Sequence, residues 1–237
     1  MERPELLCAP SEIQPSMPTL KLLPRHLTGI WMHACCVLNM VCEPWECHTW
    51  GSQFRVRNNG EMLFTVRQAR PSETFAISEL AARTFPLACP PTLERAHIDA
   101  YIRENFSPTH FDAHIGHPEH DVLVATVGSE ILGYALVLFG ADGSPSPGLG
   151  VTLNPAGLLS KCYTDPKMHG TKAGASLLVA AEERARERHA EGLWLNTNAH
   201  NIRAQRFYRK HGFSCVGDID FVVGGIVHRD PVFEKRV

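Results

Sequence analysis

The sequence predicts an α/β (α+β) fold in which one mixed sheet is flanked by helices, and two stretches carry this prediction. In residues 121–139, two β-rich runs flank a short turn, which predicts an antiparallel hairpin. In residues 158–197, a strand, a helix and another strand follow in order, which predicts a parallel βαβ unit. Antiparallel and parallel pairing within one chain imply a mixed sheet.

The elements before the hairpin are a strand, two helices and a helical turn. Residues 62–69 alternate apolar and polar side chains, which predicts the strand. Residues 72–85 and 92–106 carry apolar side chains at helical intervals, which predicts two amphipathic helices. Ser107-Pro108 then caps a short turn through residue 114.

The hairpin is followed by a loop and then by the remaining elements of the sheet. Residues 140–155 are rich in glycine and proline, which predicts the loop. Later, Gly212 suits the left-handed position that ends a helix, and Gly224-Gly225 suits a two-residue hairpin turn. The predicted elements are strand 158–164, helix 174–189, strand 193–197, helix 201–211, hairpin 221–227 and a final strand 232–237.

Composition excludes two classes of partner. The chain has 237 residues, of which 44% are hydrophobic and 20% charged, as in ordinary globular proteins. Its net charge of -2 lacks the basic footprint that nucleic-acid binding requires, so we expect no nucleic-acid partner. The apolar stretch 30–42 is too short to cross a bilayer, and the first residues do not resemble a secretory signal. We therefore expect no membrane association and a cytoplasmic protein.

A composition break divides the chain near residue 62. Residues 1–61 are rich in cysteine and tryptophan and show no useful periodicity, so we expect a disordered extension or a segment outside the native protein. Residues 62–237 form the predicted domain. A zinc site in the extension is an alternative, although the spacing of its ligands fits no zinc template. Those ligands are Cys36, Cys42, Cys47 and His48.

The segment His169-Gly170-Thr171-Lys172-Ala173-Gly174 joins a predicted strand to a predicted helix. Free backbone N–H groups and the positive end of the helix dipole suit such a place to a diphosphate, and small residues let the backbone approach closely. The side chain of Lys172 adds a positive charge. A simple strand-to-helix turn is the alternative, which this segment alone does not exclude.

A second segment, residues 201–213, reads Asn-Ile-Arg-Ala-Gln-Arg-Phe-Tyr-Arg-Lys-His-Gly-Phe. The two segments together resemble the GNAT acetyltransferase superfamily. In that family a strand ending in Asp-Pro leads to an Arg/Gln-x-x-Gly-x-Gly/Ala loop, and a later Asn-x-x-Ala-x-x-Phe-Tyr-x-x-x-Gly-Phe helix completes the cofactor site. The likeness covers residues 62–237. It implies a mostly antiparallel sheet with a splayed strand pair that binds acetyl-CoA.

The resemblance implies acetyl-CoA as the cosubstrate and assigns its contacts residue by residue. His169 stands where the family has arginine or glutamine, and Lys172 replaces a glycine, which puts the local loop geometry in doubt. The implied cofactor-binding residues are Cys162, Tyr163, Thr164, His169, Gly170, Thr171, Lys172, Ala173, Gly174, Ala175 and Asn201. Cys162 is interpreted as buried packing, and Asn201 has a helix cap as its alternative role.

The catalytic residue implied by the resemblance is Tyr208, which would protonate the departing thiolate. Its alternative role is that of a core aromatic. The predicted reaction is direct transfer of acetyl from acetyl-CoA to a primary amine, without a covalent enzyme intermediate. The general base is not identified, and the candidates are Tyr101, His110, His114 and Glu119.

The acceptor is predicted only as a class. The chain end from residue 206 resembles spermidine/spermine acetyltransferase-like members, so a small polyamine-like amine is favoured. Amino acids and protein amino termini or lysines remain open, as do a non-catalytic acetyl-CoA-binding or partner-binding module and a homodimer.

A histidine cluster offers a metal site as an alternative, because His110 and His114 lie one helical turn apart. His117 and His120 flank Pro118 outside the predicted turn. We therefore predict no metal.

Overall fold

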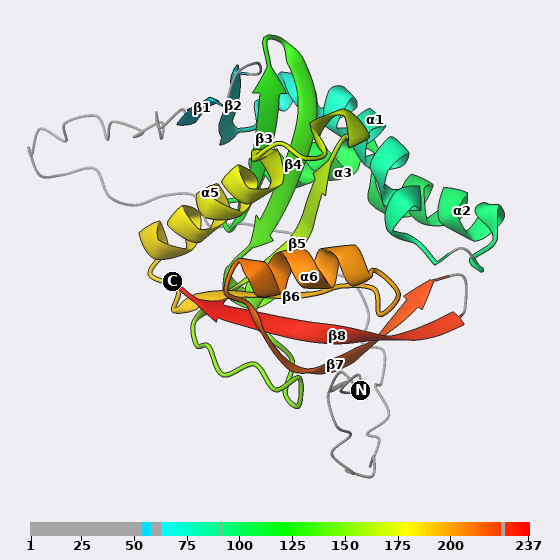
Figure 1. Ribbon diagram of the computed structural model, residues 1–237, viewed down its shortest axis with the longest axis vertical. Coiled ribbons are helices and arrows are strands. Elements are labelled where there is room, and N and C mark those ends of the chain that lie inside the picture. The colour runs from blue at the N-terminus through cyan, green and yellow to red at the C-terminus, as the bar shows by residue number, and fades with distance from the viewer. Residues whose placement is uncertain (1–53, 58–62, 91, 224–225) are drawn as a thin grey trace, which may run out of the picture. The chain divides into compact units, whose positions relative to one another are not determined.

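One mixed sheet of eight strands organises the described chain, in the order β1-β2-β3-β4-β5-β6-β8-β7 (Figure 1). The computed structural model describes residues 54–57, 63–90, 92–223 and 226–237. The strands are β1 (Phe54–Arg57), β2 (Leu63–Gln68), β3 (His120–Val127), β4 (Glu130–Leu138), β5 (Ala156–Thr164), β6 (Gly192–Asn196), β7 (Ser214–Val223) and β8 (Ile226–Arg236). All neighbouring strands are antiparallel except β5 and β6. The predicted mixed, mostly antiparallel sheet is confirmed.

Two of the α-helices in the described chain begin at residues whose side chains cap them, Ser107 and Asn201. The Ser107 hydroxyl accepts the His110 N–H at 3.3 Å and Pro108 occupies the first position of α3, where no N–H is needed. The α-helices are α1 (Thr74–Thr84), α2 (Arg95–Asn105), α3 (Pro108–Gly116), α4 (Gly140–Gly143), α5 (Ala173–Glu187) and α6 (Ile202–Lys210). Short 3-10 helices are η1 (Pro71–Glu73), η2 (Phe85–Ala88) and η3 (Pro166–Met168).

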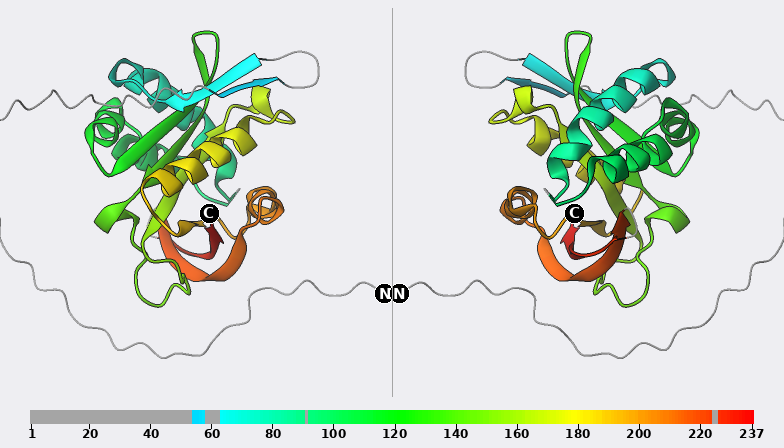
Figure 2. Two further views of the ribbon diagram at one scale, coloured as in Figure 1. Left: turned by 90° about the vertical axis from the view of Figure 1, so that its left-hand side faces the viewer. Right: turned by 90° about the vertical axis from the view of Figure 1, so that its right-hand side faces the viewer.

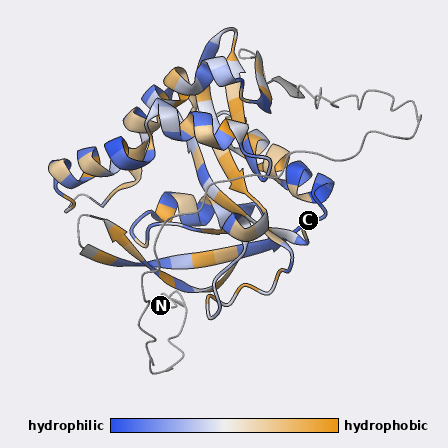
Figure 3. Cartoon of the chain, turned by 180° about the vertical axis from the view of Figure 1, so that it is seen from behind, coloured by the Kyte–Doolittle hydropathy of each residue, from blue (hydrophilic) through white to orange (hydrophobic). Residues whose placement is uncertain are grey.

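Helices cover both faces of the sheet (Figure 2). On one face, α5 and α6 pack through Leu177, Leu178 and Tyr208 against alternate residues of the strands. On the other face, α1–α3 pack through Leu80 and Phe111. Because β3 and β4 are covered on both sides, six consecutive residues of β3 are buried, and the central strands are largely orange in Figure 3.

An ion-pair network fixes α5 to the sheet. Asp121 of β3 is buried and accepts hydrogen bonds from Arg184 and Arg188 of α5, with Nε–Oδ2 distances of 3.0 and 2.9 Å. Burial alone would raise the pKa of Asp121, but its bonds to Arg188 and Arg184 outweigh burial and lower it. These ion pairs therefore hold α5 against β3.

The parallel strands β5 and β6 diverge. Their pairing stops at Leu158 and Trp194, although β5 continues to Thr164. At the same level Ser160 is an extra residue in β5, because Val137 pairs with Leu159 and Leu136 pairs with Lys161. Such a bulge bends a strand and increases its twist. Beyond it, alternate backbone groups of β5 face the gap toward β6, as predicted for a splayed pair.

The structure corrects several predicted boundaries. β7 and β8 form one long hairpin, where the sequence predicted only residues 221–227 and a separate end strand. The polar residues Asp218 and Asp220 interrupt the apolar pattern of β7, and pairing with β8 determines the strand instead. The predicted loop 140–155 begins with the short helix α4. The predicted Gly224-Gly225 turn lies outside the described residues.

The sheet also includes a strand ahead of the predicted domain start at residue 62. β1 pairs with β2 from Phe54 to Arg57. The division into 1–61 and 62–237 stays a prediction, and the proposed cysteine ligands of the front segment lie outside the described residues. Within the described ranges, no helix combines the length and the apolar character that crossing a bilayer requires.

Candidate active site

The turn from β5 into α5 presents unpaired backbone donors at a helix N-terminus. Gly170 has a φ of +80°, in the left-handed region, and turns the chain toward α5. Two neighbouring donors are used internally, because the Thr171 N–H bonds the Met168 carbonyl at 3.1 Å and the Ala173 N–H bonds the Thr171 hydroxyl at 3.2 Å. Among residues 169–175, the N–H groups without an acceptor in the described chain are those of Gly170, Lys172, Gly174 and Ala175.

These donors fit a diphosphate. They lie at the first turn of a 15-residue helix, where the dipole is positive. The space beside Gly174 is open to a ligand, because no other described atom lies within 3.7 Å of the position that a Cβ would take there. We call residues His169 to Ala175 the cradle. The side chain of Lys172 does not deform it, because Lys172 is the exposed N-cap residue at a negative φ of -86°.

Basic side chains border the cradle. Lys172 is exposed and forms no ion pair within the described part of the chain. On the other side, Arg203 of α6 lies with Nη1 3.2 Å from His169 Nδ1. Partial burial and then the charge of Arg203 lower the pKa of His169, which favours a neutral imidazole that accepts from the guanidinium. An anion bound at the cradle would therefore lie near the positive charges of Lys172 and Arg203.

The predicted contacts on β5 lie in its diverging part. Cys162 points to the α5 face, where burial raises the pKa of its thiol to about 12. Tyr163 points to the opposite face and stacks on Tyr134 with ring centroids 5.7 Å apart. The Thr164 methyl group lies beside the Cβ direction of Gly174, at 3.9 Å. The structure thus brings the β5 residues and the cradle together.

Tyr208 lies in α6 with 9% of its surface exposed and packs edge-on against Phe207 and Phe213. Burial, followed by Cys162 and Tyr163, raises the pKa of its phenol well above the ordinary value. The hydroxyl is therefore protonated and close to the diverging part of β5. The core-aromatic alternative is confirmed for Tyr208, and its catalytic role stays a prediction.

Asn201 caps α6, because its side-chain oxygen accepts the Ala204 N–H at 3.0 Å. The helix-cap alternative is confirmed. A contact of Asn201 with the cosubstrate stays a prediction.

An aromatic cluster covers the other side of β5. Tyr101 of α2 stacks on Phe85 at 4.8 Å and meets Phe106 edge-on at 5.7 Å. The β7–β8 hairpin reaches the same group, because Phe221 lies 6.1 Å from Tyr101. Lys161 places its ammonium 5.3 Å from the Phe106 ring centre, and burial lowers its pKa to about 8. Tyr208 and the aromatic cluster thus lie on opposite faces of the sheet.

The four candidate bases lie in different surroundings. Of them, Tyr101 lies in the aromatic cluster, where burial and then Cys89 raise its pKa. His110 is exposed and bonded to Ser107, with Nδ1 2.7 Å from the hydroxyl. Glu119 is exposed and packs against Gly140. His114 belongs to a separate group of histidines.

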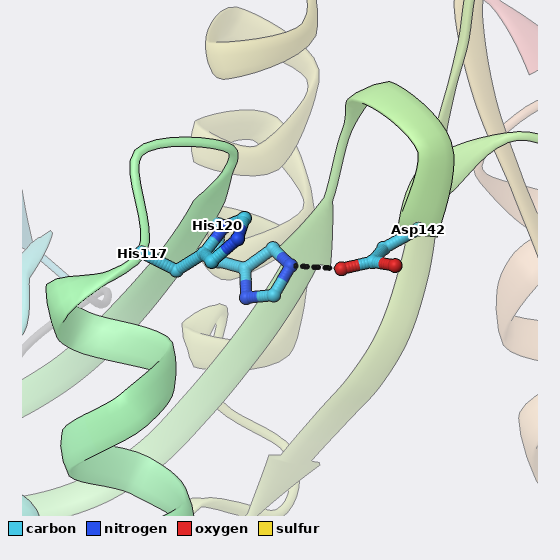
Figure 4. Close-up of side chains that lie close together, drawn as sticks. All are labelled: His117, His120 and Asp142. Carbon is cyan, nitrogen blue, oxygen red and sulfur yellow. Dashed lines mark hydrogen bonds and ion pairs between the residues drawn. The ribbon is translucent and has the colours of Figure 1, made fainter. Parts of the chain in front are cut away.

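That group joins α3, β3 and α4 (Figure 4). His120 lies with Nδ1 3.0 Å from His114 Nδ1 and with Nε2 2.9 Å from Asp142 Oδ2. His117, His120 and Asp142 bring their ligand atoms within 4.8 Å of one another. The rings of His117 and His120 are stacked at 3.9 Å, however, so their in-plane lone pairs run nearly parallel. Binding one ion would require the rings to turn, and the prediction of no metal stays a prediction.

The diverging strands and the cradle define a class of protein, the acyl-CoA-dependent transferases. A model of the Acetyltransferase (GNAT) family matches residues 76–213. An uncharacterised N-acetyltransferase of Mycobacterium tuberculosis (strain H37Rv) is 35% identical over 161 residues, which cover 68% of this chain and 96% of that protein. An uncharacterised N-acetyltransferase of Mycobacterium bovis matches with the same identity and coverage. The chain belongs to the GNAT acetyltransferase family, and is an N-acetyltransferase that uses acetyl-CoA as its cosubstrate.

Solved structures share the fold. The PaiA N-acetyltransferase of Thermoplasma acidophilum, solved with coenzyme A, superposes with a TM-score of 0.60 at 20% identity, over 74% of this chain and 100% of that chain. The ribosomal-protein-S18-alanine N-acetyltransferase of Escherichia coli gives 0.53 at 14% identity, over 73% and 94%. At these identities the likeness concerns the fold alone.

Sequence reasoning missed two features of the site. Arg203 was part of a recognised motif, but its contact with His169 depends on how α6 meets the cradle. Phe221 reaches the aromatic cluster through the long β7–β8 hairpin. Its one sequence signal was the apolar run near the chain end, which predicted a strand but not its partner.

Proposed function

We propose that this enzyme acetylates a primary amine of a small molecule by direct attack of the amine on acetyl-CoA. The observation that carries the proposal is the gap between β5 and β6, which has Tyr208 in the core on the α5 and α6 face of the sheet and the aromatic cluster on the opposite face. With the diphosphate at the cradle, the backbone of β5 would bind the pantetheine arm by strand-like pairing. The amine would then approach from the aromatic side.

Direct attack is supported by the chemistry of the nearby thiols. Burial raises the pKa of Cys162 to about 12 and that of Cys89 to about 11. Both thiols are therefore protonated at neutral pH and are poor nucleophiles. We propose that Tyr208 supplies a proton to the departing thiolate and that N–H groups of β5 polarise the carbonyl.

A small acceptor is supported by the contact between Phe221 and Tyr101. This contact joins the β7–β8 hairpin to α2 and leaves less room for an acceptor beside the aromatic cluster. Polyamines are the first probe because of the likeness of the chain end to spermidine/spermine-type members. The buried ammonium of Lys161 disfavours a second cation nearby, so amino acids, whose carboxylate would complement it, are the second probe.

Two alternatives remain. One fold neighbour acts on ribosomal protein S18 by its name, so acetylation of a protein amino terminus is one. A module that binds acetyl-CoA or a partner without turnover is the other.

The predicted homodimer is a separate question, and light scattering of the purified protein measures it.

The test is release of the CoA thiol from acetyl-CoA with spermidine, lysine, glycine and a peptide with an amino-terminal alanine, run beside thermal unfolding with coenzyme A. We expect stabilisation by coenzyme A and turnover of a small amine, with the N-acetyl product identified by mass spectrometry. Turnover of the peptide alone would favour the protein acceptor. Stabilisation without any turnover would favour the binding module.

A further inference from the structure

Asp230 of β8 differs from the other buried acids of the described chain. Its surface is 3% exposed, and no lysine or arginine within the described ranges forms an ion pair with it. The other three each have a basic partner. These pairs are Asp121 with Arg184 and Arg188, Asp165 with Arg83, and Glu182 with Lys235.

An unpaired buried carboxylate is costly when it is ionised. Burial raises the pKa of Asp230. The Ala199 N–H, which donates to Oδ1 at 3.3 Å, then His228, the Asn196 side chain and His200 only partly offset this effect. The Asp230 carboxylate therefore takes up a proton more readily than that of Asp121, whose pKa is held low by its arginines. Perturbed acids of this kind are concentrated at functional sites.

Asp230 faces the acceptor side of the gap. Alternate residues of a strand share a face, so Asp230 lies on the same face of β8 as His228, which pairs with Phe221 of β7. Phe221 in turn contacts Tyr101. After burial, Tyr101 and cysteine neighbours, the charge of Asp230 also contributes to the raised pKa of Tyr163. The carboxylate is thus within electrostatic reach of the diverging part of β5.

We infer that Asp230 is the general base that removes the proton from the acceptor ammonium before attack, directly or through one water. This inference rests on the proposed function. The carboxylate accepts one proton from R–NH3+, and the freed nitrogen lone pair forms the C–N bond with the thioester carbonyl carbon. The C–S bond then breaks and its electron pair leaves with sulfur, which Tyr208 protonates. The second amine proton returns the tyrosine to its neutral form, and Asp230 releases its proton to water.

Other titratable groups face Asp230 and belong to the pH response. They are His228 on β8, His200 in the connection from β6 to α6, and Tyr163 on β5. A structural role in accepting hydrogen bonds from the Ala199 N–H and the Asn196 side chain is the competing explanation, and the substitution Asp230→Asn separates the two. The asparagine carbonyl still accepts that N–H, but the side chain no longer takes up a proton.

The test compares spermidine, which is protonated at neutral pH, with hydroxylamine, which is largely unprotonated and needs no base before attack. We expect Asp230→Asn to lower kcat with spermidine by about 100-fold or more and with hydroxylamine by less than about 5-fold. The loss with spermidine should shrink as the pH rises toward the pKa of the amine. Asp220→Asn, at an exposed site on β7, is the matched control and should leave both rates unchanged.

Equal losses with both amines, or no loss with spermidine, would overturn the inference. Asp230→Glu keeps a carboxylate and should retain more spermidine activity than Asp230→Asn, so a pair of equally inactive variants would also count against it. Failure of the proposed function looks different, because the wild-type protein would then bind coenzyme A and acetylate neither amine nor any other amine of the panel.

Discussion

The cradle predicts that Gly174→Ala makes the protein more stable and a poorer binder of coenzyme A. A Cβ at this position meets its nearest neighbour, the Phe207 ring, at 3.7 Å, which is ordinary van der Waals contact. The φ of Gly174 lies outside the left-handed region, so alanine fits the first turn of α5 without strain. Replacing glycine by alanine in a helix then stabilises by roughly 0.5–1 kcal/mol, which for a domain of this size raises Tm by about 1–4 °C.

The same methyl group stands beside the free N–H groups to which the diphosphate would bind. Losing one charged hydrogen bond costs about 1.5–3 kcal/mol, so the Kd for coenzyme A should rise by roughly 10- to 100-fold. Calorimetric titration measures Kd and thermal unfolding measures Tm. Gly116→Ala at the end of α3, which also has open space around it, is the control and should leave Kd unchanged. A Gly174→Ala variant that binds coenzyme A like the wild-type protein would refute the cradle.

Further substitutions test the other parts of the site. Arg203→Ala should raise the Kd for coenzyme A about tenfold at low salt and less at high salt, because it removes a charge beside the cradle. Tyr208→Phe should lower kcat by about 100-fold while Tm stays within about 2 °C, because the ring packing remains; equal rates would exclude the tyrosine as acid. Asp121→Asn should lower the free energy of unfolding by roughly 3 kcal/mol in urea at pH 7. Because its arginines lower the pKa of Asp121, that contribution is present above the ordinary carboxyl pKa and is lost as the pH falls through the lowered value. Wild type and variant should therefore converge in acid, and a constant difference would contradict this.

The backbone geometry of the cradle could be predicted from sequence because its information is local, whereas its contacts with the cosubstrate stay a prediction. The cradle depends on a strand, a turn and a helix that follow directly in the chain, and on glycines whose backbone role is fixed by their lack of a side chain. Even Lys172, which departed from the family pattern, is accommodated as the exposed N-cap of α5. The helix that carries Tyr208 was equally predictable, because its cap Asn201 and its terminating Gly212 lie at its ends.

The acceptor half could not be predicted because it is made of contacts between distant segments. Phe221 meets Tyr101 across 120 positions of sequence only because β7 and β8 form a long hairpin beside β6. The hairpin in turn was underestimated because Asp218 and Asp220 interrupt the apolar run of β7. Asp230 became a candidate base because it is buried without a lysine or arginine partner in the described chain, and a sequence alone does not reveal such burial. His114, a candidate from local spacing, instead contacts His120.

Hydrogen exchange with and without coenzyme A tests the central claim most directly, because it reports on the backbone donors themselves. The amides of Gly170, Lys172, Gly174 and Ala175 have no acceptor within the described chain and should exchange fast in the free protein. Coenzyme A should protect them, together with amides of β5 between Leu159 and Thr164 that face the gap. Protection confined to other segments, with the cradle amides exchanging as fast as before, would contradict the account.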